Sequence, residues 1–265
     1  MSEHESPALE ERHVDANGIR IRYGEGGRGR PIVLLHGGLL TSDSWVDLMS
    51  MLAEDHHVIA PDLRGHGGSG HTGGPITYGL LADDAIALVE ALGLERPAFV
   101  GLSDGGNAAL EVAMRRPELP SAIVAAGAWN WRSAAFEKWV GGFLGVPPRP
   151  DLADPAAAVA EANPGFARWC AAMQGDAWPA LLNALWPAWT VEPALGAREL
   201  ARIRAPTLYV VAEDDVISVK EAEEMAHHTP GAKLHVEPGA GHGFLMQDPE
   251  RCLEIVRGFL SALPR

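Results

Sequence analysis

The stretch "AFVGLSDGGNAALEVAMRR", residues 98–116, decides the fold of this chain. A short apolar run ends at Gly101, Ser103 stands between glycines, and an amphipathic run follows at once. A Gly-x-Ser-x-Gly pattern is meaningful where a strand precedes it and a helix follows, and both are predicted here. The tight turn strains the serine backbone and leaves no room for flanking side chains. We predict that Ser103 is an exposed nucleophile rather than an ordinary start of a helix.

A serine hydroxyl becomes a good nucleophile only when a base removes its proton, so a histidine is needed elsewhere. Of the eleven histidines, His242 lies in "PGAGHGFLMQDPE", a glycine-rich stretch between the last predicted strand and the last helix. Such backbone allows close approach to a catalytic imidazole, and we predict that His242 is the base. His36 in "IVLLHGG" and His66 in "DLRGHGGSG" are predicted to brace the core instead.

The imidazole in turn needs a carboxylate that fixes its tautomer and stabilises its protonated form. The segment "LYVVAEDDVIS" places Glu213, Asp214 and Asp215 directly after a buried strand. We favour Asp215 over Asp214, because the loop needs some length to bring the carboxylate to His242. Glu213 is assigned to an exposed acidic turn.

Attack on a carbonyl creates an oxyanion, which preorganised backbone donors must stabilise. We predict that one donor is the N–H of Asp104, the residue after the nucleophile. The second is predicted to be the N–H of Gly38, in the loop that follows the strand of "IVLLHGG".

Buried apolar strands alternate with amphipathic helical patterns along most of the chain, after a hairpin expected at Asn17-Gly18. This alternation predicts an α/β fold with a mostly parallel sheet covered by helices on both faces. The strand pattern stops between about residues 129 and 204 and then resumes. We expect a core of residues 1–128 and 205–265, with residues 129–204 inserted as a helical cap. The alternative for the insertion is an all-helical packing layer.

The composition limits which binding partners and which cellular compartment are expected for this protein. The 35 acidic against 21 basic side chains give a formal net charge of -14, so neither nucleic acid nor a membrane surface is expected as a partner. Cys170 and Cys252 lack metal-ligand spacing and are expected to be buried thiols in a reducing compartment. No apolar targeting segment is evident at the amino terminus. We therefore expect a cytoplasmic protein.

Five segments together resemble the α/β-hydrolase-fold serine hydrolases: "LLHGG", "DLRGHGGSG", "VGLSDGG", "VVAEDD" and "GAGHGFLMQDPE". They span nearly the whole chain in the order and spacing of that family, except for the middle segment. The resemblance implies the α/β-hydrolase fold, a helical cap over the site, and a Ser103–His242–Asp215 triad with no cofactor or metal. Haloalkane dehalogenases would have an aspartate at Ser103. Proline iminopeptidases usually have tryptophan at Asp104, and many relatives have glycine at Ala212.

The Ser-Asp-Gly-Gly elbow at residues 103–106 is similar to that of valacyclovir-hydrolase-like enzymes, which cleave esters of α-amino acids. In those enzymes the aspartate after the serine pairs with the substrate ammonium group. The resemblance implies that Asp104 gives its N–H to the oxyanion and its carboxylate to a substrate amine. The alternative is that the charge of Asp104 merely suits the amino terminus of a helix.

Seven of the eight tryptophans fall in the middle segment, where they could line a substrate pocket or pack a cap onto the core. They are Trp129, Trp131, Trp139, Trp169, Trp178, Trp186 and Trp189. We expect most of them to serve packing. Trp129 is the preferred substrate-binding residue, because it follows the strand of "SAIVAAG", whose carboxyl end opens near the site.

These features predict a hydrolase that cleaves a carboxylic ester or thioester of a small apolar or amine-bearing acid through an acyl-enzyme. The substrate would be a small molecule or a carrier-bound acyl group, and no oligomeric state is indicated. An acyltransferase or cyclase, a C–C bond hydrolase acting on a vinylogous diketone, and a non-catalytic ligand receptor on the same fold remain as alternatives.

Overall fold

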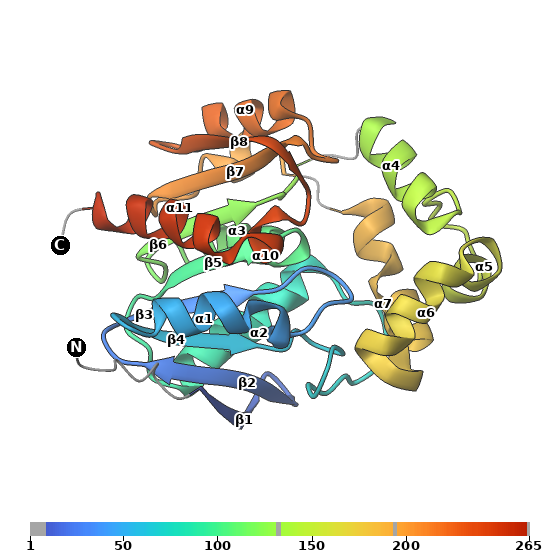
Figure 1. Ribbon diagram of the computed structural model, residues 1–265, viewed down its shortest axis with the longest axis horizontal. Helices are drawn as coiled ribbons and strands as arrows, with labels where there is room; N and C mark the ends of the chain where they lie inside the picture. The colour runs from blue at the N-terminus through green and yellow to red at the C-terminus, as the bar shows by residue number, and fades with distance from the viewer. Residues whose placement is uncertain (1–8, 131–133, 193–194, 264–265) are drawn as a thin grey trace.

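The computed structural model describes residues 9–130, 134–192 and 195–263, without the side chains of residues 134–136 and 139. One eight-stranded sheet runs through the molecule in the order β1-β2-β4-β3-β5-β6-β7-β8 (Figure 1). The strands are β1 (Glu10–Ala16), β2 (Ile19–Gly27), β3 (Arg30–Leu35), β4 (His56–Pro61), β5 (Ala98–Leu102), β6 (Ala122–Ala126), β7 (Thr207–Asp214) and β8 (Lys233–Gly241).

The sheet is mostly parallel, as the alternating pattern predicts. Strands β4, β3, β5, β6, β7 and β8 pair in parallel, whereas β2 is antiparallel to both β1 and β4. The β1–β2 hairpin turns at Asn17 and Gly18, whose φ angles of 45° and 74° match the positive values that a tight hairpin turn requires. The predicted hairpin is confirmed.

Helices cover both faces of the sheet because the side chains of each central strand alternate between two apolar clusters. In β3, Val33 and Leu35 belong to the apolar cluster on one face of the sheet, and Ile32 and Leu34 belong to the cluster on the other face. The first cluster includes residues of the helices α2, α3 and α9, and the second includes residues of α1 and α11, whose ranges follow. The flanking helices, including two short ones, are η1 (Ser42–Trp45), α1 (Val46–Leu52), α2 (Tyr78–Ala91), α3 (Asp104–Arg115), α9 (Val219–His228), α10 (Phe244–Gln247) and α11 (Pro249–Ser261).

Between β6 and β7 the described residues form helices and connecting loops but no strand. The helices are α4 (Ala134–Leu144), α5 (Pro155–Ala162), α6 (Pro164–Gln174), η2 (Gly175–Ala177), α7 (Trp178–Val191) and α8 (Ala197–Leu200). Helices α5 and α6 each begin with a proline, and the residue before it caps the helix with its side chain. Asp154 accepts from the Ala157 N–H, and Asn163 accepts from the Phe166 N–H. We call α4–α7 the helical layer. It lies beyond one end of the strands (Figure 1).

Strand β8 is longer than the sequence suggests. We predict a strand over residues 232–237 followed by a glycine-rich loop, but β8 continues to Gly241. After an irregularity, it pairs again with β7 through Asp214 and Gly241. His242 therefore follows the strand directly.

Among the described residues, no helix has the length and apolar character needed to cross a bilayer.

A buried ion pair joins the loop after β4 to helix α2. Arg64 Nε donates to Asp84 Oδ2 at 2.7 Å, and the two side chains are 3% and 7% exposed. Asn17 Nδ2 also donates to Asp84 Oδ1, at 2.7 Å, which ties the β1–β2 turn to the same carboxylate. The β1–β2 turn, the loop after β4 and helix α2 are therefore held together by the buried Asp84 carboxylate.

We predict that Asp84→Ala lowers the free energy of unfolding by about 3–5 kcal/mol, because the Arg64 charge would stay buried without its partner. The neighbouring Asp83 forms an exposed pair with Arg115 at 3.1 Å. Asp83→Ala should therefore cost no more than about 1 kcal/mol. Urea unfolding of both variants measures the difference, and equal losses would contradict a structural role for the buried pair.

Candidate active site

Ser103 occupies a strained turn between β5 and α3, with φ 55° and ψ −118°. The two flanking glycines are required by close backbone contacts. A Cβ on Gly101 would lie 2.2 Å from the Gly105 oxygen, and a Cβ on Gly105 would lie 2.1 Å from the Leu35 oxygen. The start of α3 therefore packs directly against the ends of β5 and β3. The predicted backbone conformation of Ser103 is confirmed.

The His242 imidazole is held by Asp215. Nδ1 of His242 lies 2.7 Å from Oδ1 of Asp215, whose side chain is only 2% exposed. Because a carboxylate only accepts, Nδ1 carries the proton in this contact, and Nε2 is left as the acceptor nitrogen of the neutral ring. The carboxylate is itself fixed, since it accepts from the Ala212 N–H at 3.3 Å and the Ile217 N–H at 3.2 Å.

The end of β6 also limits where the imidazole can lie. Gly127 has φ 55°, and a Cβ there would lie 2.7 Å from Cε1 of His242. The ring therefore packs against bare backbone. Asp214 and Glu213 are exposed, and Glu213 accepts from the Gly239 N–H at 2.9 Å. Glu213 and Asp214 are the last two residues of β7, so Glu213 lies in the strand and not in the expected turn. Of the three acidic residues, the structure brings Asp215 to the histidine.

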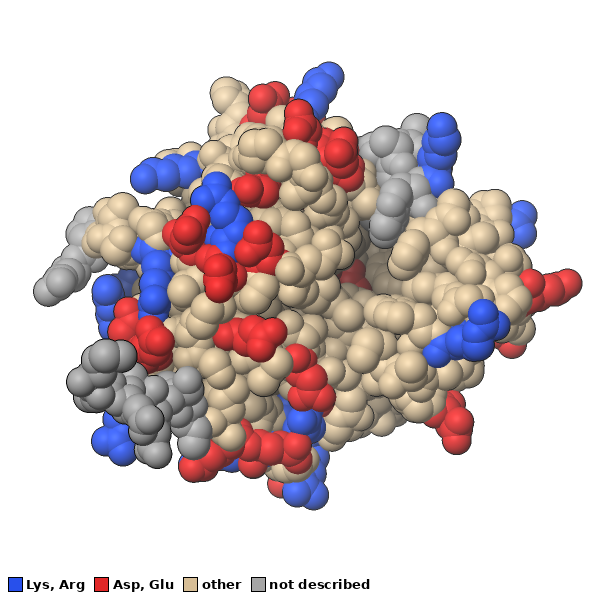
Figure 2. Space-filling model, viewed as in Figure 1, with Lys and Arg blue, Asp and Glu red and all other residues tan. Residues whose placement is uncertain are grey.

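Ser103 and His242 line one cavity of about 320 Å³. It lies between the carboxyl ends of the strands and the helical layer, and Figure 2 shows this side of the molecule hollowed between the core and those helices. The walls are mainly apolar. The helical layer contributes Val140, Phe143, Leu144, Phe166, Trp169 and Trp189.

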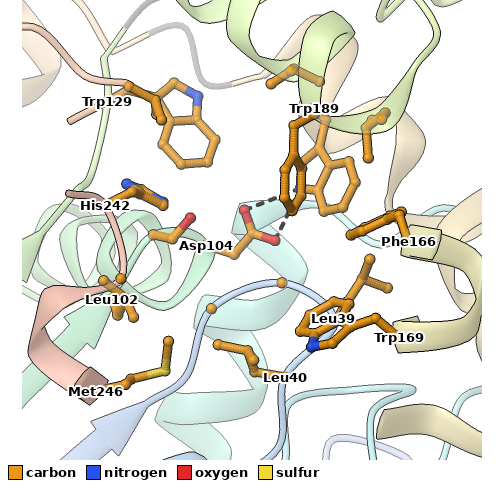
Figure 3. Close-up of a pocket in the computed structure, with 18 of the residues that line it drawn as sticks. Leu39, Leu40, Leu102, Asp104, Trp129, Phe166, Trp169, Trp189, His242 and Met246 are labelled. Carbon is orange, nitrogen blue, oxygen red and sulfur yellow. Dashed lines mark hydrogen bonds between the residues drawn. The ribbon is translucent and has the colours of Figure 1, made fainter. Parts of the chain in front are cut away.

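Asp104 is the first residue of α3, and its carboxylate faces this cavity although only 1% of Asp104 is exposed. Tyr78 Oη donates to Oδ1 at 2.8 Å, and Trp189 Nε1 lies 3.0 Å from Oδ2. Figure 3 shows the carboxylate with His242 on one side and the Trp189 indole on the other. Both expectations for Asp104, a helix-start position and an orientation toward the substrate pocket, fit this placement.

Burial raises the pKa of Asp104, although the hydrogen bonds from Trp189 and Tyr78 act in the opposite direction. Within the described residues Asp104 has no ion pair with lysine or arginine, and both of its direct donors are neutral. The site therefore contains a desolvated carboxylate without a lysine or arginine partner among the described residues, and the charge of His242 acts on its pKa in the lowering direction. A cationic group of a ligand would supply one.

Gly38 lies against the Asp104 carboxylate, and a Cβ on Gly38 would be 2.2 Å from Oδ2. In the same loop, the Leu39 N–H donates to His66 Nε2 and the Leu40 N–H to the Gly37 oxygen. The N–H groups of Gly38 and Asp104 have no acceptor within the described part of the protein. These two predicted donors are therefore free for a ligand at the cavity wall.

Two buried histidines hold this loop in place. His66 Nε2 accepts from the Leu39 N–H at 3.1 Å, and His36 Nε2 accepts from the Leu63 N–H at 2.9 Å. Burial lowers the pKa of both rings, and that of His66 falls to about 3. The rings are neutral braces at pH 7. Their predicted structural role is confirmed.

The tryptophans divide between the cavity and the core. Trp129 is 2% exposed and lines the cavity, as do Trp169 and Trp189. Trp186 donates to the Arg149 oxygen at 2.7 Å, and Trp178 packs at the edge of the core. Trp131 and the side chain of Trp139 lie outside the described residues.

Sequence reasoning missed two partners of Asp104. Tyr78 begins α2, and no motif distinguishes it from other core tyrosines. Trp189 is one of several tryptophans at helical spacing, which indicates packing as readily as a role in the site.

The two cysteines confirm one further expectation. Cys170 and Cys252 are free, buried thiols, and burial raises the pKa of Cys170 to about 11. Such thiols are poor nucleophiles.

Within the described residues, no group of three or more His, Cys, Asp or Glu is arranged to hold a metal ion. Apart from the tryptophan indoles, the polar side chains among the described residues that line the cavity belong to Ser103, Asp104, His242 and Gln247.

Comparison with known proteins gives a consistent class. A family model described as "Alpha/beta hydrolase family" matches residues 32–255. A Caulobacter sp. (strain K31) protein named "Putative carbamate hydrolase RutD" is 30% identical over 251 residues, covering 88% of this chain and 91% of that protein. A solved thermophilic esterase from Thermogutta terrifontis is 25% identical, with a TM-score of 0.75 over 95% of this chain and 98% of the other.

A further match covers about half of the chain. The 2-hydroxy-6-oxo-6-(2'-aminophenyl)hexa-2,4-dienoic acid hydrolase of Metapseudomonas resinovorans is 32% identical over 131 residues, which is 48% of this chain and 45% of that protein. These similar proteins are all named as hydrolases or esterases. The fold is thus the α/β-hydrolase fold, and the protein is an enzyme of the hydrolase class.

The buried neutral ring of His66 predicts a pH dependence of stability. Its folded pKa of about 3 lies below the ordinary value of 6.5. The stabilising contribution is therefore complete above pH 6.5 and decreases as the pH falls toward 3, with a slope of about 1.4 kcal/mol per pH unit. We expect His66→Gln to remove this slope, measured by urea unfolding at pH 6 and pH 5. Equal slopes in the two proteins would contradict the prediction.

Proposed function

The chain belongs to the alpha/beta hydrolase family, and on that premise we propose that it is a serine hydrolase working through Ser103, His242 and Asp215. The observation that carries the proposal is the His242–Asp215 contact of 2.7 Å, made beside the cavity that Ser103 also lines. An oriented imidazole beside a cavity that is also lined by a partly exposed, strained serine is the arrangement that nucleophilic acyl transfer requires.

In the proposed reaction, Ser103 Oγ attacks the carbonyl carbon while His242 Nε2 accepts the hydroxyl proton. Asp215 stabilises the resulting imidazolium through Nδ1. The tetrahedral intermediate collapses when His242 returns the proton to the leaving alcohol or thiol, and the acyl group stays on Ser103. Water, deprotonated by the same imidazole, then attacks the acyl-enzyme and releases the acid.

We propose that the N–H groups of Gly38 and Asp104 stabilise the oxyanion of both tetrahedral intermediates. The support is their position at the cavity wall and their lack of acceptors among the described residues. Donors that are already fixed need no reorganisation when the negative charge develops, which lowers the barrier. The bracing of the loop by His36 and His66 supplies that fixation.

We propose that residues 129–204 act as the substrate-binding cap. Helices of this segment supply six residues of the cavity wall, and Trp129 lies at the junction with the core. A cavity of about 320 Å³ lined mainly by apolar side chains suits a small acyl group. The substrate is therefore proposed to be an ester or thioester of a small apolar or amine-bearing acid.

The amine-bearing substrate is supported by the Asp104 carboxylate, which faces the cavity without a lysine or arginine partner among the described residues. A substrate ammonium group would provide the missing charge. Carbamates are a second candidate class, because the steps above also cleave a carbamate carbonyl and because the similarity to the RutD protein covers 88% of this chain. The partial match to the Metapseudomonas resinovorans hydrolase keeps C–C bond cleavage as a further candidate.

Replacing the buried carboxylate of the proposed triad tests the function. We predict that Asp215→Asn lowers kcat for p-nitrophenyl butyrate by about 10³- to 10⁴-fold, because the amide cannot stabilise the imidazolium. Asp214→Asn, a change at the adjacent exposed residue, is the matched control and should retain activity within about twofold. Similar losses in both variants, or none in Asp215→Asn, would contradict the proposed triad.

The amine proposal has its own test. We predict that the wild-type protein prefers p-nitrophenyl L-alaninate over p-nitrophenyl propionate, which differ only by the ammonium group. Asp104→Asn should reduce this ratio of kcat/KM values at least about tenfold, because it removes the charge that pairs with the ammonium. The asparagine keeps an oxygen that can accept from Tyr78 and Trp189. An unchanged ratio would remove Asp104 from substrate recognition.

A further inference from the structure

The side chain of Gln174 joins the helical layer to two loops of the core. Its Nε2 donates to the Leu39 oxygen and to the Leu40 oxygen, both at 2.9 Å. Its Oε1 accepts from the Gly67 N–H, also at 2.9 Å. Gln174 is the last residue of α6, so a single amide fastens the end of this helix to the loops that follow β3 and β4.

Leu39 is strained, and this gives the contact its importance. Its φ angle is 61°, in the left-handed region that a leucine rarely adopts. Such a conformation persists only when the surroundings hold it. His66 accepts from the Leu39 N–H, and Gln174 donates to the Leu39 oxygen. The side chains of His66 and Gln174 therefore bind the N–H and the carbonyl oxygen of Leu39, respectively.

The strained residue directly follows Gly38, the proposed oxyanion donor. Leu39 borders the peptide groups of residues 38–39 and 39–40, whereas the Gly38 N–H belongs to the peptide group before them. A relaxation of Leu39 therefore reaches this N–H through the φ and ψ angles of Gly38. Asp104 and Trp189 require a glycine at this position, since a Cβ on Gly38 would lie 2.2 Å from Asp104 Oδ2 and 2.8 Å from Trp189 Cζ2. A glycine is also the residue whose backbone turns most easily. The Gly38 N–H and the Gln174 amide are therefore linked through Leu39.

We infer that Gln174 is a positioning residue for the oxyanion site, an inference that rests on the proposed function. It holds Leu39 in its strained conformation and so keeps the Gly38 N–H directed for catalysis. Because Phe166 and Trp169 of the same helix line the cavity, α6 provides both a wall for the substrate and the clamp on the catalytic loop. Docking of α6 and assembly of the oxyanion site are thus one event.

Three variants test this inference with p-nitrophenyl butyrate as substrate. Gln174→Ala should lower kcat at least about tenfold with KM within about threefold, because a misdirected donor weakens binding of the transition state more than that of the substrate. Gln174→Glu, which has nearly the same shape, should lose at least as much, since its carboxylate would face the Leu39 and Leu40 oxygens. Met173→Ala, at the preceding exposed residue of α6, is the control and should match the wild type.

A boronic acid gives a second readout, because butylboronic acid forms a tetrahedral adduct with an active serine. Its affinity should fall in parallel with kcat in both Gln174 variants. A wild-type kcat in folded Gln174→Ala, or in folded Gln174→Glu if the alanine variant does not fold, would overturn the inference. A rise in KM with kcat unchanged would also overturn it, since Gln174 would then only dock the helix.

The same experiment separates failure of the inference from failure of the proposed function. A wild-type protein that neither hydrolyses the ester nor binds the boronic acid would overturn the proposed function and this inference together. An active wild type whose Gln174 variants retain both properties would overturn the inference alone.

Discussion

The contact between the start of α3 and the ends of two strands is the constraint on which the rest of the site depends. Backbone lies against backbone there, because any Cβ on Gly101 or Gly105 would come within about 2.2 Å of a neighbouring oxygen. This approach forces Ser103 to φ 55° and brings the loop after β3 beside it. The proposed nucleophile and the proposed oxyanion donors are therefore positioned by one packing contact.

The parallel sheet explains why distant residues meet at this point. Parallel strands end at the same edge, so Ser103 after β5, Asp215 after β7 and His242 after β8 are brought to one side of the molecule. Bare backbone at Gly127, after β6, leaves space for the imidazole between them. The helical layer then forms a wall of the cavity. Through Gln174 it contacts the loop after β3, and through Trp189 it contacts the Asp104 carboxylate.

The sequence predicts the parts of this arrangement that depend on local signals. Glycines around Ser103, a carboxylate after a buried strand and a histidine before the last helix each mark a strand end, and the parallel fold implies that these ends meet. The length of β8 is missed because its glycine-rich end is stabilised by pairing with β7, not by propensity. The surroundings of Asp104 are missed because its partners lie 26 and 85 residues away along the chain. Contacts of that range depend on how helices pack, and no local pattern encodes them.

The central claim is that Ser103 is an activated nucleophile. Covalent labelling with a fluorophosphonate, followed by mass spectrometry of the proteolytic peptides, tests it most directly. The proposed chemistry predicts one phosphonyl group per chain on the peptide that contains Ser103, and no labelling of a folded Ser103→Ala variant. A folded wild-type protein that stays unlabelled, or that carries the label equally after Ser103→Ala, would contradict the claim.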